Sequence, residues 1–224
     1  LQGERINILE STKELVPSPQ AALSRMVLPE QIDFQDWPQA YGVPTHAPKH
    51  AALPKEVRQA WRKNIGSIRG HVVNPPIVLR DQLFVVNSDH TIQALNVTNG
   101  KKNWAIKLPI PKGEETDFTS GLAAYDSAVF VTTPTGLVFA LNPQNGEVVW
   151  QIDVAAPLRT APAVRGGKLF IKSHDNRMFV ANTKDGSLLW THTGIAESLS
   201  LAKGATPAVT QDTAIIAYTS GDVY

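Results

Sequence analysis

The residues best suited to chemistry in this sequence are three carboxylates, Glu114, Glu115 and Asp117, in a glycine-containing segment. Paired carboxylates can carry out acid–base catalysis, and a loop of carboxylates can bind Ca²⁺. Such a cluster on a loop is more often a solvated face. We therefore interpret it as solvent-facing and predict neither a metal ligand nor a catalytic residue in it.

Histidine and cysteine give no catalytic or metal-binding pattern either. The chain has no cysteine, which removes thiolate metal sites, cysteine nucleophiles and disulfides. No nucleophile elbow, phosphate-binding loop or dinucleotide-binding fingerprint occurs. The six histidines show no spacing that would place two on one metal: His46, His50, His71, His90, His174 and His192. We predict that the chain is not an enzyme and carries no cofactor.

The composition is typical of a globular chain and does not indicate nucleic-acid binding. Of 224 residues, 42% are hydrophobic, which is enough for a sizeable core. Twenty-one Lys and Arg balance 20 Asp and Glu to a formal charge of +1. Since no long basic run is present, we exclude nucleic acid as the main partner. No apolar run approaches the 18 residues of a membrane-spanning helix.

A 21-residue unit occurs three times and dictates the fold. It begins at Phe84, Phe130 and Phe170 and ends at a tryptophan each time, and a fourth copy starts at Ile215. Each unit contains an Asn-Gly or Asp-Gly pair, the strongest short hairpin signal, and an earlier turn at His90 or its equivalents. With the strand that precedes it, each unit supplies four antiparallel strands, the fourth ending at the tryptophan.

Repeated four-stranded units of about 40 to 46 residues predict an all-β fold, a β-propeller of four-stranded antiparallel blades. The alternating period of two excludes stacked helical hairpins. A β-sandwich is compatible with the number of strands but does not predict identical units. The tryptophans are expected to fill the wedge between adjacent blades, because a large ring there joins units that share no ladder. They are Trp61, Trp104, Trp150 and Trp190.

The domain organisation follows from where the repeat begins. Residues 1–58 do not repeat, are rich in proline, and are predicted to be an extended arm on the body of the protein. Residues 59–224 are predicted to form a partial propeller. It comprises a ring-closing strand at 59–66, blades at about 67–109, 110–154 and 155–194, and an incomplete blade at 195–224.

The connections between units differ in length, and the long ones are the candidate binding loops. Only 11 residues separate Trp150 from the next first strand, against 17 after Trp104 and 16 after Trp190. Loops on a rigid scaffold are where binding residues concentrate. In the last loop, Leu199 and Leu201 alternate with Ser198 and Ser200, so both leucines would point the same way in an extended chain. The two leucine side chains can either contact a partner or pack as core residues between two blades.

The repeat and two further stretches resemble known families. The pattern ALN-x-x-x-G-x-x-x-W at Ala94–Trp104 and Ala140–Trp150 resembles the PQQ-type propeller repeat. The stretch Asp36–Gly42, with His46 downstream, resembles the N-terminal part of BamB-type lipoproteins of the outer-membrane β-barrel assembly machinery. Ser198–Leu201 is similar to the loop by which that family binds the barrel-assembly subunit BamA.

This resemblance implies a non-enzymatic periplasmic scaffold that binds BamA and assists outer-membrane protein insertion, with unfolded outer-membrane proteins as further partners. The implied contacts are Ser198, Leu199, Ser200, Leu201 and Lys203. The family's arginine falls on Ala202, so the positive charge at Lys203 is displaced by one residue. The family also implies a lipid anchor upstream of residue 1, at the inner face of the outer membrane.

Eight blades are typical of the family, so the chain corresponds to about half of an eight-bladed ring, and we expect the native protein to continue past Tyr224. Two alternatives remain open. One is a quinoprotein dehydrogenase that uses PQQ and Ca²⁺, although this chain lacks the cysteine pair and a recognisable ligand set of such enzymes. The other is a generic propeller interaction domain.

Overall fold

The computed structural model describes residues 18, 27–66, 74–110, 120–195, 197 and 204–224. Contacts divide the chain into residues 1–30 and residues 31–224. All strands of the described residues lie in the second unit. Within the described part of the chain, no helix reaches the length and apolarity needed to cross a bilayer.

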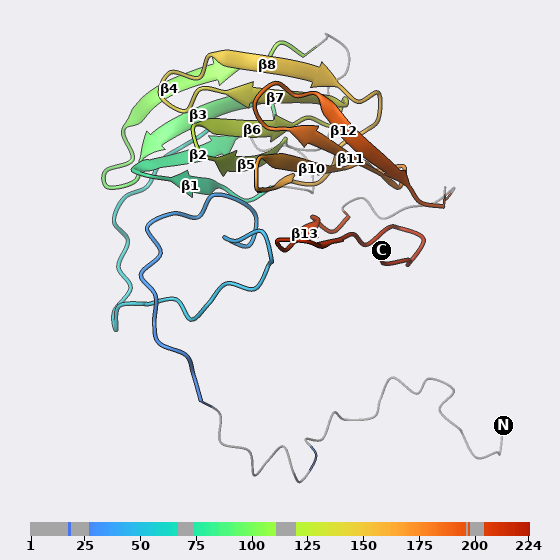
Figure 1. Cartoon of the computed structure of the whole chain (residues 1–224). Helices are drawn as coiled ribbons and strands as arrows, with labels where there is room; N and C mark the ends of the chain where they lie inside the picture. The colour runs from blue at the N-terminus through green and yellow to red at the C-terminus, as the bar shows by residue number, and fades with distance from the viewer. Residues whose placement is uncertain (1–17, 19–26, 67–73, 111–119, 196, 198–203) are drawn as a thin grey trace, which may run out of the picture. The chain divides into compact units, whose positions relative to one another are not determined.

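In its described residues, the second unit consists of three four-stranded antiparallel sheets and a two-stranded ladder (Figure 1). In each sheet the strands follow one another in chain order. The first sheet contains β1 (Ile77–Leu79), β2 (Gln82–Val86), β3 (Thr91–Asn96) and β4 (Lys102–Lys107). The second contains β5 (Gly121–Tyr125), β6 (Ala128–Thr132), β7 (Leu137–Leu141) and β8 (Val148–Asp153). The third contains β9 (Ala163–Arg165), β10 (Lys168–Lys172), β11 (Arg177–Asn182) and β12 (Leu188–Thr193), and the ladder pairs β13 (Ala208–Val209) with β14 (Ala214–Ile215).

These sheets are consecutive blades of a partial β-propeller. The first strands of successive sheets contact one another: β1 meets β5, β5 meets β9, and β9 meets β13. The fourth strands lie at the outer edges, and their side chains are mostly exposed. The sequence-based prediction of an all-β propeller is therefore confirmed.

The hydrophobic core lies between neighbouring blades. Phe84 and Ile92 of the first sheet belong to the same buried cluster as Phe139 and Leu141 of the second. A second cluster joins the second and third sheets, and a third joins the third sheet to Val209 and Tyr218. Apolar side chains on both faces of β6, β7, β10 and β11 explain why these strands are buried almost throughout.

The hairpin predictions are confirmed by the backbone. The turns between second and third strands place His90, Gly136, Asn176 and Gly221 at positive φ. His90 is a turn residue, as its alignment with glycine predicts. The turns between third and fourth strands place Gly100, Gly146 and Gly186 at positive φ. One prediction is wrong: the fourth strands do not end at tryptophan but continue three residues further, to Lys107, Asp153 and Thr193. In these strands the alternation of exposed and half-buried residues continues past the tryptophan.

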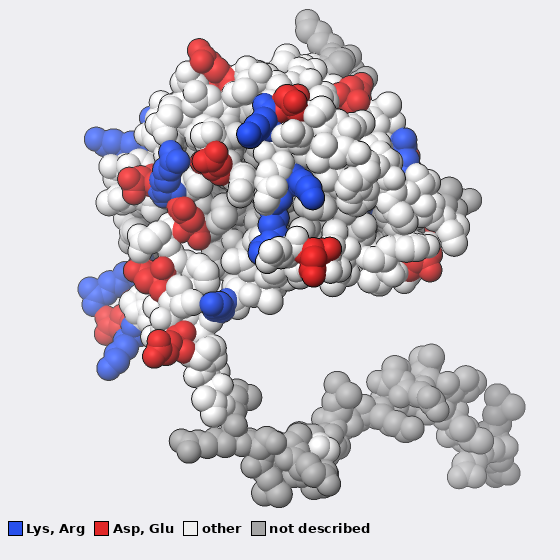
Figure 2. All heavy atoms as spheres, in the orientation of Figure 1, with Lys and Arg blue, Asp and Glu red and all other residues white. Residues whose placement is uncertain are grey.

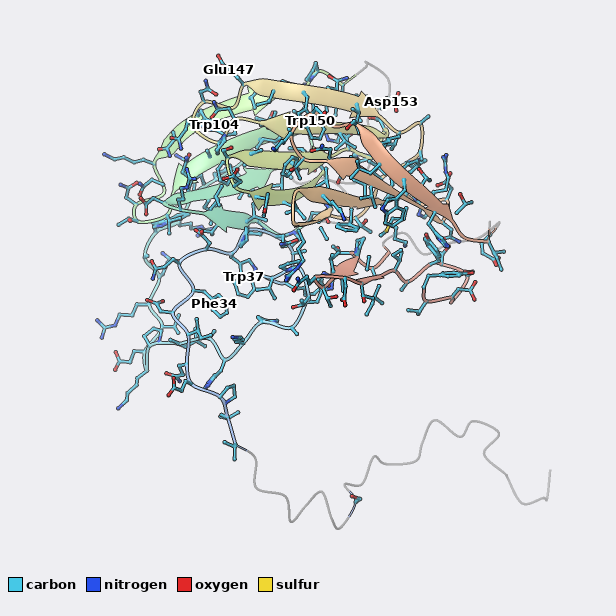
Figure 3. All side chains as sticks on the ribbon, in the orientation of Figure 1. Phe34, Trp37, Trp104, Glu147, Trp150 and Asp153 are labelled. Atoms are coloured by element: carbon cyan, nitrogen blue, oxygen red, sulfur yellow. The ribbon has the colours of Figure 1, made fainter. Side chains whose placement is uncertain are left out.

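Three tryptophans make the same contact with the next blade. The indole Nε1 of Trp61, Trp104 and Trp150 donates to the carbonyl of Val97, Pro143 and Thr183, at 2.7, 2.9 and 3.0 Å. Each acceptor lies three residues before the turn glycine on which that ring packs. Figure 3 shows Trp104 and Trp150 on neighbouring outer strands. Trp190 is 44% exposed. The contribution of these rings to stability stays a prediction.

Residues 59–66, predicted to close the ring, have no strand assignment. Trp61 nonetheless occupies the place on the first blade that Trp104 occupies on the second. A closing strand pairs with the last blade of a ring, so its pairing stays a prediction. The same holds for the boundary between arm and propeller at residue 58.

Part of the arm bonds to the first strand of each successive blade. Trp37 exchanges two backbone hydrogen bonds with Val78 of β1, at 2.8 and 2.9 Å. The Ala124 amide of β5 donates to the Pro38 carbonyl at 2.6 Å, and the Val209 amide of β13 donates to the Pro44 carbonyl at 2.7 Å. The arm thus satisfies backbone groups that the first strands present at their free edges.

Gln39 connects the arm to the third blade through its side chain. Its amide oxygen accepts from the Val164 amide at 3.0 Å, and its amide nitrogen donates to the Val164 carbonyl at 3.3 Å. The side chain therefore replaces a peptide unit in pairing with β9. Gln39 is only 4% exposed, so these bonds satisfy polar groups that water does not reach.

Candidate functional site

The loop predicted to bind a partner lies outside the described residues. This applies to Ser198, Leu199, Ser200, Leu201 and Lys203, and also to the acidic cluster at Glu114, Glu115 and Asp117. Both ends of the partner loop are described, at Ile195 and Glu197 on one side and Gly204 on the other. The structure therefore shows what holds the base of the loop.

The loop begins with a hydrogen bond that every blade repeats. The amide of Gly194 donates to the Asn176 carbonyl at 2.8 Å. In the first blade Leu108 donates in the same way to His90, and in the second Val154 donates to Gly136. The three connections between blades therefore leave their outer strands in the same manner.

Gly194 differs from its counterparts by leaving space for an aromatic ring. Leu108 and Val154 are buried, 3% and 5% exposed. A Cβ on Gly194 would lie 2.6 Å from the Tyr218 ring. Tyr218 thus takes the space beside the third blade that an aliphatic side chain fills elsewhere.

Asn176 ties the start of the loop to the fourth unit. Its amide nitrogen donates to the Ile195 carbonyl at 2.7 Å, and its amide oxygen accepts from both the amide and the hydroxyl of Thr219, at 3.0 and 2.8 Å. Asn176 is 1% exposed. An asparagine tolerates positive φ and also brings an amide side chain, which glycine at this turn position would lack.

Three aromatic side chains pack beside this bond network. The His192 ring stacks on Tyr218, with centroids 5.7 Å apart, and its Nδ1 lies 2.8 Å from the Tyr218 hydroxyl. Tyr224 contacts both rings. Burial, and secondarily the neighbouring Tyr224, raises the pKa of Tyr218 to about 12. The hydroxyl therefore stays protonated at neutral pH, and it is placed to hydrogen-bond His192.

A cationic cluster lies at the other end of the loop. Lys172, at the end of β10, is 2% exposed, and its ammonium is 5.9 Å from the centroid of the Tyr218 ring. A Cβ on Gly204 would collide with Nζ of Lys172. Arg159 Nη1 lies 2.9 Å from Nε2 of His174. Arg159 comes from the β8–β9 connection, while Lys172 ends β10 and His174 lies in the β10–β11 turn.

The pKa values within this cluster reflect burial and mutual repulsion. Burial lowers the pKa of Lys172. Burial also lowers the pKa of His174, and the positive charges of Arg159 and Lys172 lower it further, against a smaller opposing effect of Asp175. Burial raises the pKa of Asp175, but hydrogen bonds from Arg177 and Ser173 outweigh this and leave it lowered. Asp175 is thus engaged by Arg177, at 2.7 Å.

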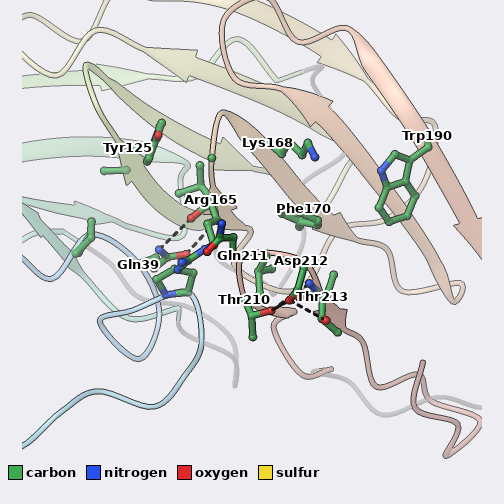
Figure 4. Close-up of a pocket in the computed structure, with 17 residues that line it drawn as sticks. Gln39, Tyr125, Arg165, Lys168, Phe170, Trp190, Thr210, Gln211, Asp212 and Thr213 are labelled. Atoms are coloured by element: carbon green, nitrogen blue, oxygen red, sulfur yellow. Dashed lines mark hydrogen bonds between the residues drawn. The ribbon is translucent and has the colours of Figure 1, made fainter.

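A groove of 780 Å³ lies between the third blade and the β13–β14 ladder (Figure 4). Trp190 and Phe170 line it on the blade side, and Thr210–Ala214 line it on the ladder side. Gln39 and Pro44 of the arm complete the lining. The groove is on the side of the β9–β10 and β13–β14 turns, whereas the partner loop leaves from the opposite ends of the strands.

The described residues bring together no group of side chains that could hold a metal ion. No three His, Asp or Glu side chains within them gather as metal ligands. The described histidines are dispersed: His90 lies 3.0 Å from Ser120, His174 beside Arg159, and His192 beside Tyr218. Figure 2 shows cationic and anionic side chains interspersed on the face in view.

The family is decided by a match over most of the sequence. The family model described as "Outer membrane protein assembly factor BamB" matches residues 47–114 and 108–224. This chain belongs to the BamB family. The match includes the arm from residue 47, all the blades and the partner loop.

Curated relatives carry the same family name. A BamB from Moranella endobia is 27% identical over 173 residues, covering 73% of this chain and 45% of the relative. A BamB from Yersinia pestis is 28% identical over 187 residues, covering 76% of this chain and 47% of the relative. The chain thus spans about half the length of these BamB relatives.

Solved structures show the same fold. The BamB crystal structure from Moraxella catarrhalis superposes with a TM-score of 0.57 at 22% identity, over 73% of this chain and 51% of that one. A quinohemoprotein alcohol dehydrogenase from Comamonas testosteroni superposes with a TM-score of 0.58 at 20% identity, over 70% of this chain and 27% of that one. At these identities the likeness concerns the propeller fold alone, which BamB shares with the dehydrogenase.

Sequence reasoning missed three residues that shape the site. Asn176 has a visible signal, because it stands where other repeats have His90, Gly136 or Gly221. Lys172 is a charged residue at the end of an otherwise apolar strand, and no alternation of buried and exposed residues in β10 marks it as buried. Gln39 has no local signal, because its partner Val164 is 125 residues away.

Proposed function

We propose that this chain is part of a non-enzymatic periplasmic scaffold subunit of the outer-membrane β-barrel assembly machinery. In this proposal the propeller binds the periplasmic domains of BamA through Ser198–Lys203 and assists insertion of outer-membrane proteins. A lipid anchor upstream of residue 1 would hold the native protein at the inner face of the outer membrane. The observation that carries the proposal is the BamB family match over residues 47–224.

The base of the loop supports a binding role for it. The amide nitrogen of Asn176 donates to the Ile195 carbonyl at 2.7 Å, and this bond fixes the start of the loop. Gly204 lies against Lys172 at its end. A loop held at both ends by a rigid blade loses less entropy on binding than an unrestrained one. Alternating leucines in an extended segment suit strand addition to a partner's sheet edge, with the leucines filling pockets.

The test is the double variant Leu199→Asp/Leu201→Asp, assayed by co-purification with the periplasmic domains of BamA. We expect loss of binding, because two carboxylates would have to enter apolar pockets without partners. The matched control is Ser198→Asp/Ser200→Asp, which puts the same charge on the other side of the same loop and should retain more binding. Unchanged binding by a folded leucine variant would contradict the assignment of the loop.

The same preparation distinguishes the dehydrogenase alternative. The protein is incubated with PQQ and Ca²⁺ and then dialysed, and the absorption spectrum and dye-linked alcohol oxidation are measured. The scaffold proposal expects neither a retained chromophore nor turnover. Retained cofactor with oxidation of alcohol would replace the scaffold proposal by the enzyme.

A further inference from the structure

A second groove, of 860 Å³, lies between the second and third blades. Turns from three blades and the outer strand β8 form its walls. Tyr125 and Val149 line it and are 39% and 60% exposed, and half-buried Trp150 lines it as well. A groove of this volume lined by aromatic and apolar side chains is typical of binding sites in proteins.

The Trp150 ring is a fixed wall of this groove. Its Nε1 donates to the Thr183 carbonyl at 3.0 Å, and the ring packs on Gly186 of the third blade. The polar atom of the indole therefore has its acceptor within the protein. What the groove offers a ligand is apolar contact with Trp150, Tyr125 and Val149.

This groove adjoins the 780 Å³ groove beside the β13–β14 ladder (Figure 4), because Tyr125 and Gly166 line both. Gly166 has a φ of 56°, and Arg80 and Asp126 have φ values of 54° and 56° at the same turn position of the preceding blades. A glycine is therefore not needed for this turn. A Cβ on Gly166 would meet nothing within 4 Å, so the missing side chain leaves the passage between the grooves open.

The charges along the two grooves favour an acidic ligand. Four cations line the grooves against two carboxylates: Arg80, Lys184, Arg165 and Lys168 against Asp126 and Asp212. None of the four cations belongs to an ion pair within the described residues. The Asp212 carboxylate already accepts from the hydroxyls of Thr210 and Thr213. Since the whole chain has a formal charge of only +1, this surface is more basic than the chain around it.

We propose that the two grooves form one docking surface for an extended polypeptide segment that carries both aromatic and acidic residues. Its aromatic side chains enter the grooves beside Trp150 and Trp190, and its carboxylates meet the cations at the rims. The partner loop leaves from the opposite ends of the strands. The surface therefore goes beyond the proposed function, and a second polypeptide can bind here while the loop is occupied.

The experiment measures the fluorescence anisotropy of a labelled peptide, in which tyrosines are flanked by glutamates, during titration with the full chain. We expect binding that weakens as salt is added, because the cations are exposed and are screened. Peptides with lysine in place of glutamate, or serine in place of tyrosine, should bind about tenfold more weakly. Absence of binding, or equal binding of the glutamate and lysine peptides, would overturn the proposal.

The apolar part of the surface is tested by Val149→Asp, with Val148→Asp as the matched control. Both valines are exposed neighbours on β8, but consecutive side chains of a strand point to opposite faces, and only Val149 lines the groove. Val149→Asp should bind the glutamate peptide about tenfold more weakly, and Val148→Asp should bind it as the unchanged chain does. Both variants should melt at similar temperatures, because each places one aspartate in the same strand. Equal affinities of the two variants would contradict the assignment of the groove.

The charged part is tested by Lys184→Gln, with Lys101→Gln as its control. Both lysines are exposed in turns between third and fourth strands, and only Lys184 lines the groove. Lys184→Gln should weaken binding and make its salt dependence shallower, whereas Lys101→Gln should change neither. Identical salt dependence of the two variants would show that the groove does not recognise acidic residues.

The passage at Gly166 is tested with a peptide that carries the same motif twice. The doubled peptide should bind the unchanged chain more tightly than the single one, because its second motif reaches the adjoining groove. Gly166→Asn should remove this advantage, since asparagine tolerates positive φ and adds a side chain in the passage. An undiminished advantage would mean that the two grooves are not one surface. None of these assays involves BamA, so their failure would leave the proposed function unaffected.

Discussion

The indole Nε1 of Trp104 donates a hydrogen bond to the Pro143 carbonyl, 2.9 Å away in the next blade. Trp150 makes the same bond to Thr183. In both cases the ring packs on the turn glycine three residues after the acceptor. A single repeated residue thus supplies apolar contact and a polar bond across a boundary where the blades share no strand ladder.

The first prediction is that Trp150→Ala destabilises the chain more than Trp190→Ala. Trp150 is half-buried and bonded to the next blade, so its loss should lower the free energy of unfolding by about 3 kcal/mol. Trp190 is 44% exposed, and its loss should cost about 1 kcal/mol. Urea denaturation of the two variants measures the difference. Equal losses would show that the contact with the following turn is not what stabilises the blades.

The second prediction tests the turn side of the same contact, with Gly146→Ala compared with Gly166→Ala. Both glycines have positive φ, 77° and 56°, so alanine is strained at each by about 1 kcal/mol. A Cβ at Gly146 would also lie 2.7 Å from the Trp104 ring, whereas at Gly166 it would meet nothing within 4 Å. Gly146→Ala should therefore have the lower melting temperature. Matching melting temperatures would mean that the ring moves aside at no cost.

These repeated features could be predicted from the sequence because they are local. Positive φ at Gly100, Gly146 and Gly186 follows from Asn-Gly and Asp-Gly pairs that any hairpin would need. The shared unit length of 21 residues, from phenylalanine to tryptophan, then identifies the tryptophans as equivalent. The end of the outer strand at Lys107 has no such local signal, because the alternation of side chains continues past Trp104 without a turn residue to stop it.

The arrangement of the candidate site could not be predicted in this way. The bonds of Gln39 to Val164 and of Asn176 to Thr219 join residues 125 and 43 positions apart. Neither partner carries a pattern that identifies the other. The contact between Lys172 and the Tyr218 ring likewise requires knowing how the third blade faces the fourth unit.

The third prediction concerns the arm. Gln39→Ala should lower the free energy of unfolding by about 2 kcal/mol or more, because the amide and carbonyl of buried Val164 would lose these partners. Gln35→Ala is the control, since Gln35 is exposed and bonds to neighbouring Asp33. Its effect should stay within about 0.5 kcal/mol. Urea denaturation and trypsin cleavage at exposed Lys49 report stability and release of the arm. If Gln39→Ala behaves as Gln35→Ala does, the arm is held by its backbone bonds alone.

The fourth prediction is a dependence of stability on pH through His174. Burial and the charges of Arg159 and Lys172 hold the pKa of His174 below its ordinary value of 6.5 in the folded chain. As the pH falls below 6.5, the unfolded chain therefore takes up a proton before the folded chain does. The contribution of the neutral ring to stability is complete above pH 6.5 and is lost as the pH falls toward the lowered pKa.

His174→Gln removes this titration and keeps an oxygen that can accept from Arg159 at the position of Nε2. Melting temperatures are measured between pH 7.5 and pH 5, and the variant should lose less stability on acidification than the unchanged chain. His46→Gln should remove a second, additive part, because burial lowers the pKa of His46 as well. If His174→Gln has the same pH profile as the unchanged chain, the ring is either solvated or already protonated, and the cluster is less enclosed than its geometry indicates.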